Sequence, residues 1–232
     1  MESLSNTQGF AIYGANSDDQ SGYSVSSAGD VNRDGYADVI IGAPFTDTFE
    51  RYNVGTSYVI YGKSTNSNID LANLSNTQGF VVYGAAQYDY SGWSVSGAGD
   101  VNGDGYDDVI IGAPAGLPNN GHRGTGTSYI IYGSSSLVDI YLTDLTSNQG
   151  FAIYSAAGNL AGYSVSGAGD VNGDGYGDII IGAPGAYYGT AGKSYVIYGK
   201  VYNSNINLNS LSLEQGFSVV GANLGDFSGE FV

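Results

Sequence analysis

Three stretches of the chain carry oxygen-bearing side chains at a spacing that suits a cation. Each reads Asp-x-Asn-x-Asp-Gly-x-x-Asp, and the copies begin at Asp30, Asp100 and Asp170, 70 residues apart. Side-chain oxygens at positions 1, 3, 5 and 9, a backbone carbonyl at position 7 and Gly at position 6 match the oxygen-only coordination of Ca²⁺. We therefore expect about three Ca²⁺ ions, one per complete repeat. The predicted ligands, with each Tyr contributing its carbonyl oxygen, are Asp30, Asn32, Asp34, Tyr36 and Asp38, then Asp100, Asn102, Asp104, Tyr106 and Asp108, and then Asp170, Asn172, Asp174, Tyr176 and Asp178.

The acidic density of these loops also has a simpler reading, in which Asp, Asn and Gly cluster only because they form turns. The three copies, however, keep every oxygen-bearing position while their neighbours change, as where Arg33 gives way to Gly103 and Gly173. Three carboxylates this close together repel one another unless a cation neutralises them. The pattern therefore favours a cation, which we interpret as structural rather than catalytic.

The available donors narrow the choice of metal. The chain has no Cys and one His, which excludes a zinc site of the usual nitrogen and sulfur kind. Mg²⁺ is disfavoured because it usually keeps several waters instead of accepting a nearly all-protein cage. Calcium loops suit places where calcium is plentiful, so we expect an extracellular or cell-surface location, although the first residues lack a signal-peptide pattern.

The composition indicates an all-β protein. The 232 residues include 38 Gly and 21 Tyr but only 6 Lys and Arg together, which favours short strands and many turns over helices. The formal net charge is −16, so nucleic acid and anionic membrane surfaces are poor partners. No apolar run approaches the ~20 residues of a membrane span.

Each repeat contains four predicted strands around its cation loop. Alternation, apolar runs and bounding Gly residues predict strands over 23–28, 38–42, 55–62 and 79–84 in the first unit. The equivalents are 93–98, 108–112, 126–133 and 150–155, and then 163–168, 178–182, 192–199 and 216–221. Four short strands per repeat are typical of a β-propeller blade. The second strand is apolar at successive residues and is expected to be buried on both faces.

The repeats predict one propeller domain over residues 1–232, with complete blades over approximately 21–85, 91–156 and 161–222. Residues 1–15 match a fourth strand without its blade, and residues 226–232 match the entry to a first strand. Propellers typically close with four to eight blades. The ring is then completed either by further blades of a longer protein or by copies of this chain, so a homo-oligomer is one expectation.

The repeated segments resemble the FG-GAP repeat, the blade of the integrin α-subunit β-propeller and of many bacterial secreted proteins. The Gly-Ala-Pro element stands at 42–44, 112–114 and 182–184. The Phe-Gly element is altered, because Ser21, Ser91 and Ala161 precede the Gly and an aromatic residue follows it. The resemblance implies a seven-bladed propeller with calcium loops on one face and ligands on the opposite face. It does not carry over a membrane span or a β-subunit partner.

The predicted function is a calcium-stabilised extracellular binding or adhesion module with a protein or glycan ligand. Its ligand surface should lie on loops opposite the calcium loops, because these vary among repeats while the strands do not. A carbohydrate-binding lectin propeller and a structural spacer of a larger surface protein remain alternatives. The candidate ligand residues are Phe45, Tyr52, Tyr88, Tyr90, Tyr187 and Tyr188.

An enzyme is not expected. His122 is the only His, occurs in one repeat and has no companion nucleophile, so it reads as a solvated loop residue. The paired carboxylates belong to the cation loops and are poor candidates for glycoside hydrolysis.

Overall fold

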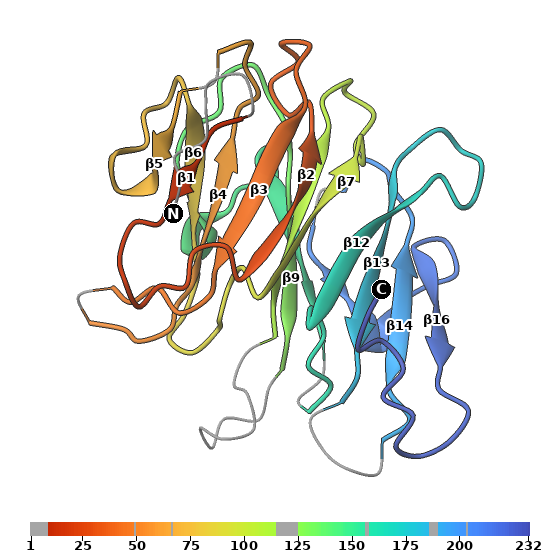
Figure 1. The fold of residues 1–232 in the computed structure, drawn as a ribbon. Helices are drawn as coiled ribbons and strands as arrows, with labels where there is room; N and C mark the ends of the chain where they lie inside the picture. Colours follow the sequence, from red (N-terminus) through yellow and green to blue (C-terminus); the bar gives the residue numbers. More distant parts are fainter. Residues whose placement is uncertain are drawn as a thin grey trace.

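Alternating apolar residues between glycine-bounded turns give each repeat an antiparallel four-stranded sheet. The computed structural model describes residues 9–48, 50–65, 67–114, 125–155, 158–185, 190–202 and 204–232. Its sheets stand side by side like the blades of an open fan (Figure 1). This arrangement confirms the predicted all-β fold built of propeller blades.

The three blades repeat one strand order from the inner to the outer edge. The first blade runs β2 (Ser24–Gly29), β3 (Asp38–Ala43), β4 (Thr56–Ile60) and β6 (Gly79–Tyr83). The second runs β7 (Ser94–Gly99), β8 (Asp108–Ala113), β9 (Thr127–Ile131) and β11 (Gly150–Tyr154). The third runs β12 (Ser164–Gly169), β13 (Asp178–Ala183), β14 (Lys193–Ile197) and β16 (Gly216–Val220). The predicted strands agree with these bounds to within two residues.

A short strand that the sequence did not predict fastens each blade to the one before it. β10 (Ile140–Tyr141) pairs in parallel with β6, and β15 (Ile206–Asn207) pairs in parallel with β11. β5 (Ile69–Asp70) pairs in the same way with β1 (Ile12–Tyr13). Each short strand leads into a 3₁₀ turn: η1 (Leu71–Asn73), η3 (Leu142–Asp144) and η4 (Leu208–Ser210). The chain therefore links neighbouring blades at their outer edges.

The core lies between the blades. Strand register places Ile40, Val59 and Phe80 in one row across the first blade, and this row packs against Val95 and Ile111 of the second blade in one buried cluster. The equivalent row of the second blade packs against the third. The sheet of the second blade is therefore covered on both faces, as expected from the apolar run of its second strand, β8, whose residues are all buried.

The inner strands of adjacent blades lie so close together that one position in each of β7 and β12 has no room for a side chain. A Cβ on Gly97 would lie 2.9 Å from the carbonyl oxygen of Ser27, and one on Gly167 would lie 2.8 Å from that of Gly97. Ser27 occupies the equivalent position of the first blade and is exposed. Glycine is thus needed where a preceding inner strand packs, which agrees with the crowding expected near a propeller axis.

The two outermost blade faces are only partly covered by the described residues. Val25 of the first blade is 64% exposed, whereas its equivalents Val95 and Val165 are 6% and 5% exposed. On the third blade, Phe217 and Val219 are 37% and 51% exposed. Among the described residues, no helix is long and apolar enough to cross a membrane.

Candidate functional site

The predicted cation loops join the first and second strands of each blade and share one backbone conformation. The glycine at position 6 has a φ of 91°, 90° and 92° in the three copies, a left-handed conformation that favours Gly. The side chain at position 1 closes the loop, since Asp30 Oδ1 accepts the Asp34 N–H at 3.0 Å and Oδ2 accepts the Gly35 N–H at 2.9 Å. The same two bonds recur in the second and third loops.

Positions 3 and 5 also face the loop backbone. Asn32 Oδ1 accepts the Asp34 N–H at 3.0 Å, and the Asn32 amide donates to Asp34 Oδ2 at 3.0 Å. Asp34 Oδ1 in turn accepts the Tyr36 N–H at 2.9 Å. These contacts repeat in the other copies with distances of 2.8 to 3.0 Å. The oxygen-bearing side chains are therefore gathered within one turn of chain.

The aspartate at position 9 is the buried member of each loop. Asp38, Asp108 and Asp178 are 1%, 0% and 0% exposed. Asp38 Oδ2 accepts the Val31 N–H at 2.9 Å, and its Oδ1 accepts the Gly62 N–H at 2.7 Å. This carboxylate thus ties the cation loop to the turn after the third strand, and the second and third loops repeat both bonds.

Two of these buried carboxylates are electrostatically strained. Burial raises the pKa of Asp38 to about 6, and the nearby Asp34 and Asp30 carboxylates raise it as well, against two backbone hydrogen bonds that lower it. In the second loop the same causes raise the pKa of Asp108 to about 8. A carboxylate that is buried beside like charges gains stability from either a proton or a metal cation.

The predicted ligands of each loop are close in sequence, but their oxygen atoms do not converge on one point in the way that a metal site requires. Among the residues that the structure describes, no group of three or more His, Cys, Asp or Glu side chains is positioned to hold a metal ion. The carboxylates at positions 1, 5 and 9 are turned toward backbone N–H groups instead. A carboxylate oxygen that accepts one hydrogen bond keeps a second lone pair for a cation, so the donor set fits Ca²⁺ and the sites stay a prediction.

The three loops also contact one another in series. Asp107 of the second loop accepts the Asp30 N–H of the first at 2.8 Å, and the Gly177 N–H of the third donates to the Asp100 carbonyl at 2.8 Å. The Arg33 guanidinium lies 5.8 Å from the Tyr106 ring centroid. In the next pair, a Cβ on Gly103 would meet the Tyr176 ring at 2.5 Å. The Tyr176 ring thus occupies the space that a side chain at position 103 would need, which is consistent with Gly103 where the first loop has Arg33.

The predicted ligand loops lie at the other end of the strands. The loop between β3 and β4 runs beside the loop that leads into the second blade, since the Tyr88 N–H donates to the Tyr52 carbonyl at 2.9 Å. Arg51 reinforces this contact by donating to the Ala85 carbonyl at 2.7 Å. The structure therefore brings two of the variable loops together into one surface.

An aromatic cluster lies at this end of the blades, and Tyr23, Phe45, Tyr90, Trp93 and Tyr163 form it. Tyr23 and Trp93 have ring centroids 4.7 Å apart, and Trp93 lies 5.7 Å from Tyr163. Phe45 packs edge-on against Tyr23 and Tyr90 at 5.8 and 5.7 Å. The aromatic residue that follows each Ser-Gly or Ala-Gly thus spans adjacent blades. The sequence showed an aromatic residue after each of these glycines, but it did not reveal that they pack with Phe45 and Tyr90.

The candidate ligand residues differ in how accessible they are. Tyr52 is 61% exposed, Phe45 and Tyr88 are half-buried, and Tyr90 is 3% exposed within the cluster. Tyr187, Tyr188 and His122 lie outside the described residues. The cluster therefore meets solvent through Tyr23, which is 44% exposed, and in part through the half-buried Phe45, Trp93 and Tyr163.

Comparison with known proteins agrees with the repeat structure. The FG-GAP repeat model matches residues 21–60, 91–131 and 161–197, about half of the chain. The chain is 34% identical over 172 residues to integrin alpha-PS5 of Drosophila melanogaster and 32% identical over 168 residues to integrin alpha-5 of Xenopus laevis. Each alignment covers 71% of this chain and 15% of the relative.

A protein with an enzyme name also matches. Phosphatidylinositol-glycan-specific phospholipase D of Bos taurus is 32% identical over 199 residues, which are 81% of this chain and 22% of that protein. The chain thus spans less than a quarter of each of these three relatives. The repeated blades, the three Asp-rich loops and the match to the family model together show that the chain belongs to the FG-GAP repeat family of β-propellers.

Proposed function

We propose that this chain is a calcium-stabilised binding module of an extracellular or cell-surface adhesion protein. The observation that carries this proposal is the threefold recurrence of one oxygen-lined loop with a buried aspartate at its end. The integrin alpha relatives support an adhesion role for the whole protein. In this role the blades are a scaffold, and the variable loops at the opposite end bind the ligand.

Calcium would act here as a structural ion. It would neutralise three carboxylates per loop, including a buried one whose pKa is raised in the first two copies. The residues that would hold it in the first loop are Asp30, Asn32, Asp34, the Tyr36 carbonyl and Asp38, and the equivalent residues of the other two loops would hold two more ions. Because the loops touch in series, binding at one loop would also order its neighbour.

The ligand surface would combine the paired loops with the aromatic cluster. Phe45, Tyr52 and Tyr88 supply large side chains that are at least partly accessible. Aromatic side chains of this kind anchor protein interfaces because they bury much area at a small entropic cost. A protein ligand is therefore the favoured partner, and it requires no catalytic group.

A lectin is the second candidate, because the half-buried faces of Phe45 and Trp93 suit the faces of sugar rings. A glycan array probed with and without calcium separates the two candidates. Calcium-dependent signals that Phe45→Ala removes would favour the lectin. A silent array, together with calcium-dependent capture of the chain on immobilised extracellular matrix proteins, would favour the protein ligand.

The calcium role is tested by thermal unfolding with calcium and with chelator. A site that binds only the folded state adds about 2.7 kcal/mol when calcium is 100 times its Kd, which is roughly 5 to 10 °C for a chain of this size. Asp34→Ala should lose part of this calcium-dependent shift, whereas Asp18→Ala, an exposed aspartate outside the loops, should keep it. Overlapping melting curves with calcium and chelator would mean that the loops are only turns.

A further inference from the structure

The second cation loop reaches back to the first loop through Asp107. Asp107 Oδ2 accepts the Asp30 N–H at 2.8 Å, and the Asp107 N–H donates to the Asp30 carbonyl at 3.4 Å. A Cβ on Gly29 would collide with the same carboxylate, so the Asp107 side chain packs directly on the backbone of the first loop. One residue of the second blade therefore holds both backbone groups of Asp30.

The position of Asp107 in its own loop connects this contact to the second cation site. Residue 107 lies between Tyr106, whose carbonyl is a predicted ligand, and Asp108, the buried predicted ligand at the end of the loop. Across the contact, Asp30 is the first predicted ligand of its own loop, and its carboxylate closes that loop. A cation that fixes the backbone on both sides of Asp107 would therefore also fix the start of the first loop.

A second side chain links the same two loops. Arg33 of the first loop extends over the second, where its guanidinium carbon lies 5.8 Å from the Tyr106 ring centroid. In the next pair of loops, glycine stands at both of the linking positions, as Gly103 and Gly177. That pair keeps the backbone hydrogen bond from the Gly177 N–H to the Asp100 carbonyl. Contacts from these two side chains thus distinguish the first pair of loops from the second.

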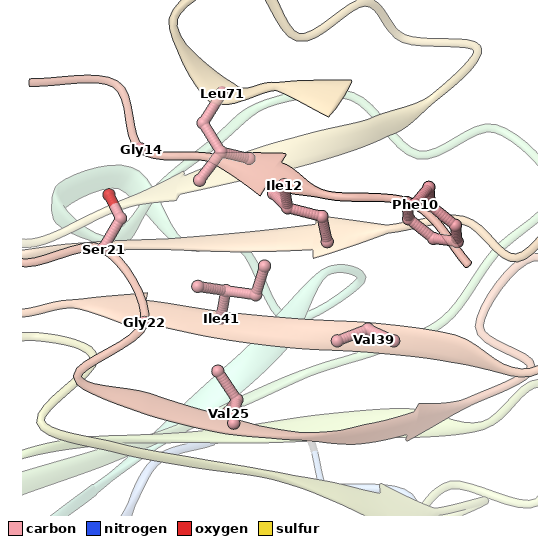
Figure 2. Close-up of a pocket in the computed structure, with 9 residues that line it drawn as sticks. All are labelled: Phe10, Ile12, Gly14, Ser21, Gly22, Val25, Val39, Ile41 and Leu71. Atoms are coloured by element: carbon pink, nitrogen blue, oxygen red, sulfur yellow. The ribbon is translucent and has the colours of Figure 1, made fainter. Parts of the chain in front are cut away.

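Among the described residues, the first loop is bonded to one neighbouring blade only. Its hydrogen bonds to another blade go to Asp107 and to Ser134, whose N–H donates to the Val31 carbonyl at 2.9 Å. The other face of the first blade is open, and Figure 2 shows Val25 and Val39 in the hollow on that face. An effect of a neighbouring blade on the first loop can therefore be traced to the second blade.

We propose that, given the calcium role proposed above, Asp107 is a positioning residue that couples the first two calcium sites. An ion bound in the second loop raises the affinity of the first loop through the Asp107 clamp, by which we mean the hydrogen bond from the Asp30 N–H to the Asp107 carboxylate. Such a bond to an ionised acceptor is stronger than one between neutral groups. Coupling between sites typically changes affinity by roughly 5- to 150-fold and is reciprocal, so an ion in the first loop favours the second equally.

The clamp is tested without calcium, by ¹⁵N NMR hydrogen exchange of the Asp30 amide in the full chain. Asp107→Ala should speed this exchange by about tenfold or more, because the N–H loses its acceptor. Ala37 occupies the equivalent position of the first loop, so alanine suits this turn. Asp107→Asn keeps an acceptor oxygen and should stay within about threefold of the unsubstituted chain. Equal exchange in all three proteins would overturn the clamp.

The coupling is tested by a chelator-buffered calcium titration of the full chain, followed by ¹⁵N NMR at one glycine amide in each loop, namely Gly35, Gly105 and Gly175. Asp104→Ala should raise the calcium concentration at half-saturation of Gly35 by about tenfold, and Asp34→Ala should raise that of Gly105 by a similar factor. When either change is combined with Asp107→Ala, the increase should shrink to less than about twofold.

The single variants separate positioning from charge. Asp107→Ala should raise the half-saturation concentration at Gly35 by about tenfold and leave that at Gly175 within about twofold, whereas Asp107→Asn should raise it at Gly35 by less than about threefold. An Asn variant as weak as the Ala variant would overturn the clamp in favour of the charge alone. Calcium shifts in all three loops with no dependence on Asp104 or Asp107 at Gly35 would overturn the coupling and leave the calcium role standing. The absence of calcium shifts in every loop would overturn both.

Discussion

The clearest consequence of the stacked blades is that equivalent valines differ in what they contribute to stability. Val95 belongs to the cluster between the first two blades and is 6% exposed, whereas Val25 is 64% exposed on the open face. Both side chains follow a Ser in the first strand of a blade. Val95→Ala and Val25→Ala are therefore the same chemical change in the same strand position.

The size of the difference follows from burial. Val95→Ala removes two buried methyl groups, worth about 1.6 kcal/mol at ~0.8 kcal/mol per buried carbon, and leaves a cavity that adds about 1 kcal/mol. We expect a loss of roughly 2 to 3 kcal/mol in the free energy of unfolding. Val25→Ala should cost less than about 0.5 kcal/mol. The lower strand propensity of Ala affects both variants alike.

Urea unfolding in calcium, followed both by Trp93 fluorescence and by circular dichroism, measures these costs. Coincident transitions of the two probes are required, because arrays of repeats can unfold in more than one step. A Val25→Ala variant as destabilised as Val95→Ala would refute the reasoning, since it would mean that the first blade face is covered in solution. Two near-neutral variants would refute the packing of the first two blades.

Three further outcomes follow from the structure. Gly167→Ala should lower the free energy of unfolding by about 1 to 3 kcal/mol, because the new Cβ would lie 2.8 Å from the Gly97 carbonyl oxygen. Ser27→Ala, at the equivalent exposed position of the first blade, should be near neutral. Equal losses for the two variants in urea unfolding would contradict the close packing of the inner strands. Burial raises the pKa of Asp89 to about 6, although the hydrogen bond from the Ala86 N–H and the charge of Arg51 lower it. Because this folded-state pKa exceeds the unfolded value near 4, the free energy of unfolding should fall as the pH rises from about 4 through 6. Asp89→Asn should remove that fall and add roughly 1 to 2 kcal/mol at pH 8 and nothing at pH 4, whereas parallel pH profiles for the two proteins would show that Asp89 is not the titrating group. Phe45→Ala should weaken ligand capture while leaving the calcium-dependent melting shift intact; loss of that shift would mean that Phe45 acts through folding.

Much of the fold was predictable because the signals are local. Residues 55–62 and 79–84 show the apolar pattern and the bounding glycines that are typical of a strand between turns. The structure places β4 and β6 in these ranges. The turns of the predicted cation loops were likewise predictable, because their geometry depends on Asp, Asn and Gly within nine residues. Repetition at 70 residues then separated the pattern from chance.

The features that were not predicted depend on contacts between repeats. β10 has two residues, and it forms because Ile140 pairs with Val82 and Asp139 accepts the Val81 N–H at 2.9 Å. No local pattern reveals a partner 58 residues away. Arg33 likewise could be placed only once Tyr106 of the next loop was known to lie over it.

In the candidate site, too, the local features were predictable from the sequence and the contacts between distant residues were not. The spacing of Asp38 suggested a ligand, but it could not reveal that both carboxylate oxygens hold backbone N–H groups, one of them from Gly62 after the third strand. The position of Tyr90 in a variable loop suggested a contact surface, but packing with Phe45 and Trp93 leaves it 3% exposed. Burial of a loop aromatic is decided by neighbouring blades.

The central claim, that each complete repeat binds one Ca²⁺, is tested most directly by isothermal titration calorimetry of the chelator-treated chain with CaCl₂. We expect about three ions per chain and one fewer in each of Asp34→Ala, Asp104→Ala and Asp174→Ala. The exposed control Asp18→Ala should keep the full number. A titration without binding heat, in a chain whose melting curve is also unchanged by millimolar calcium, would contradict the claim.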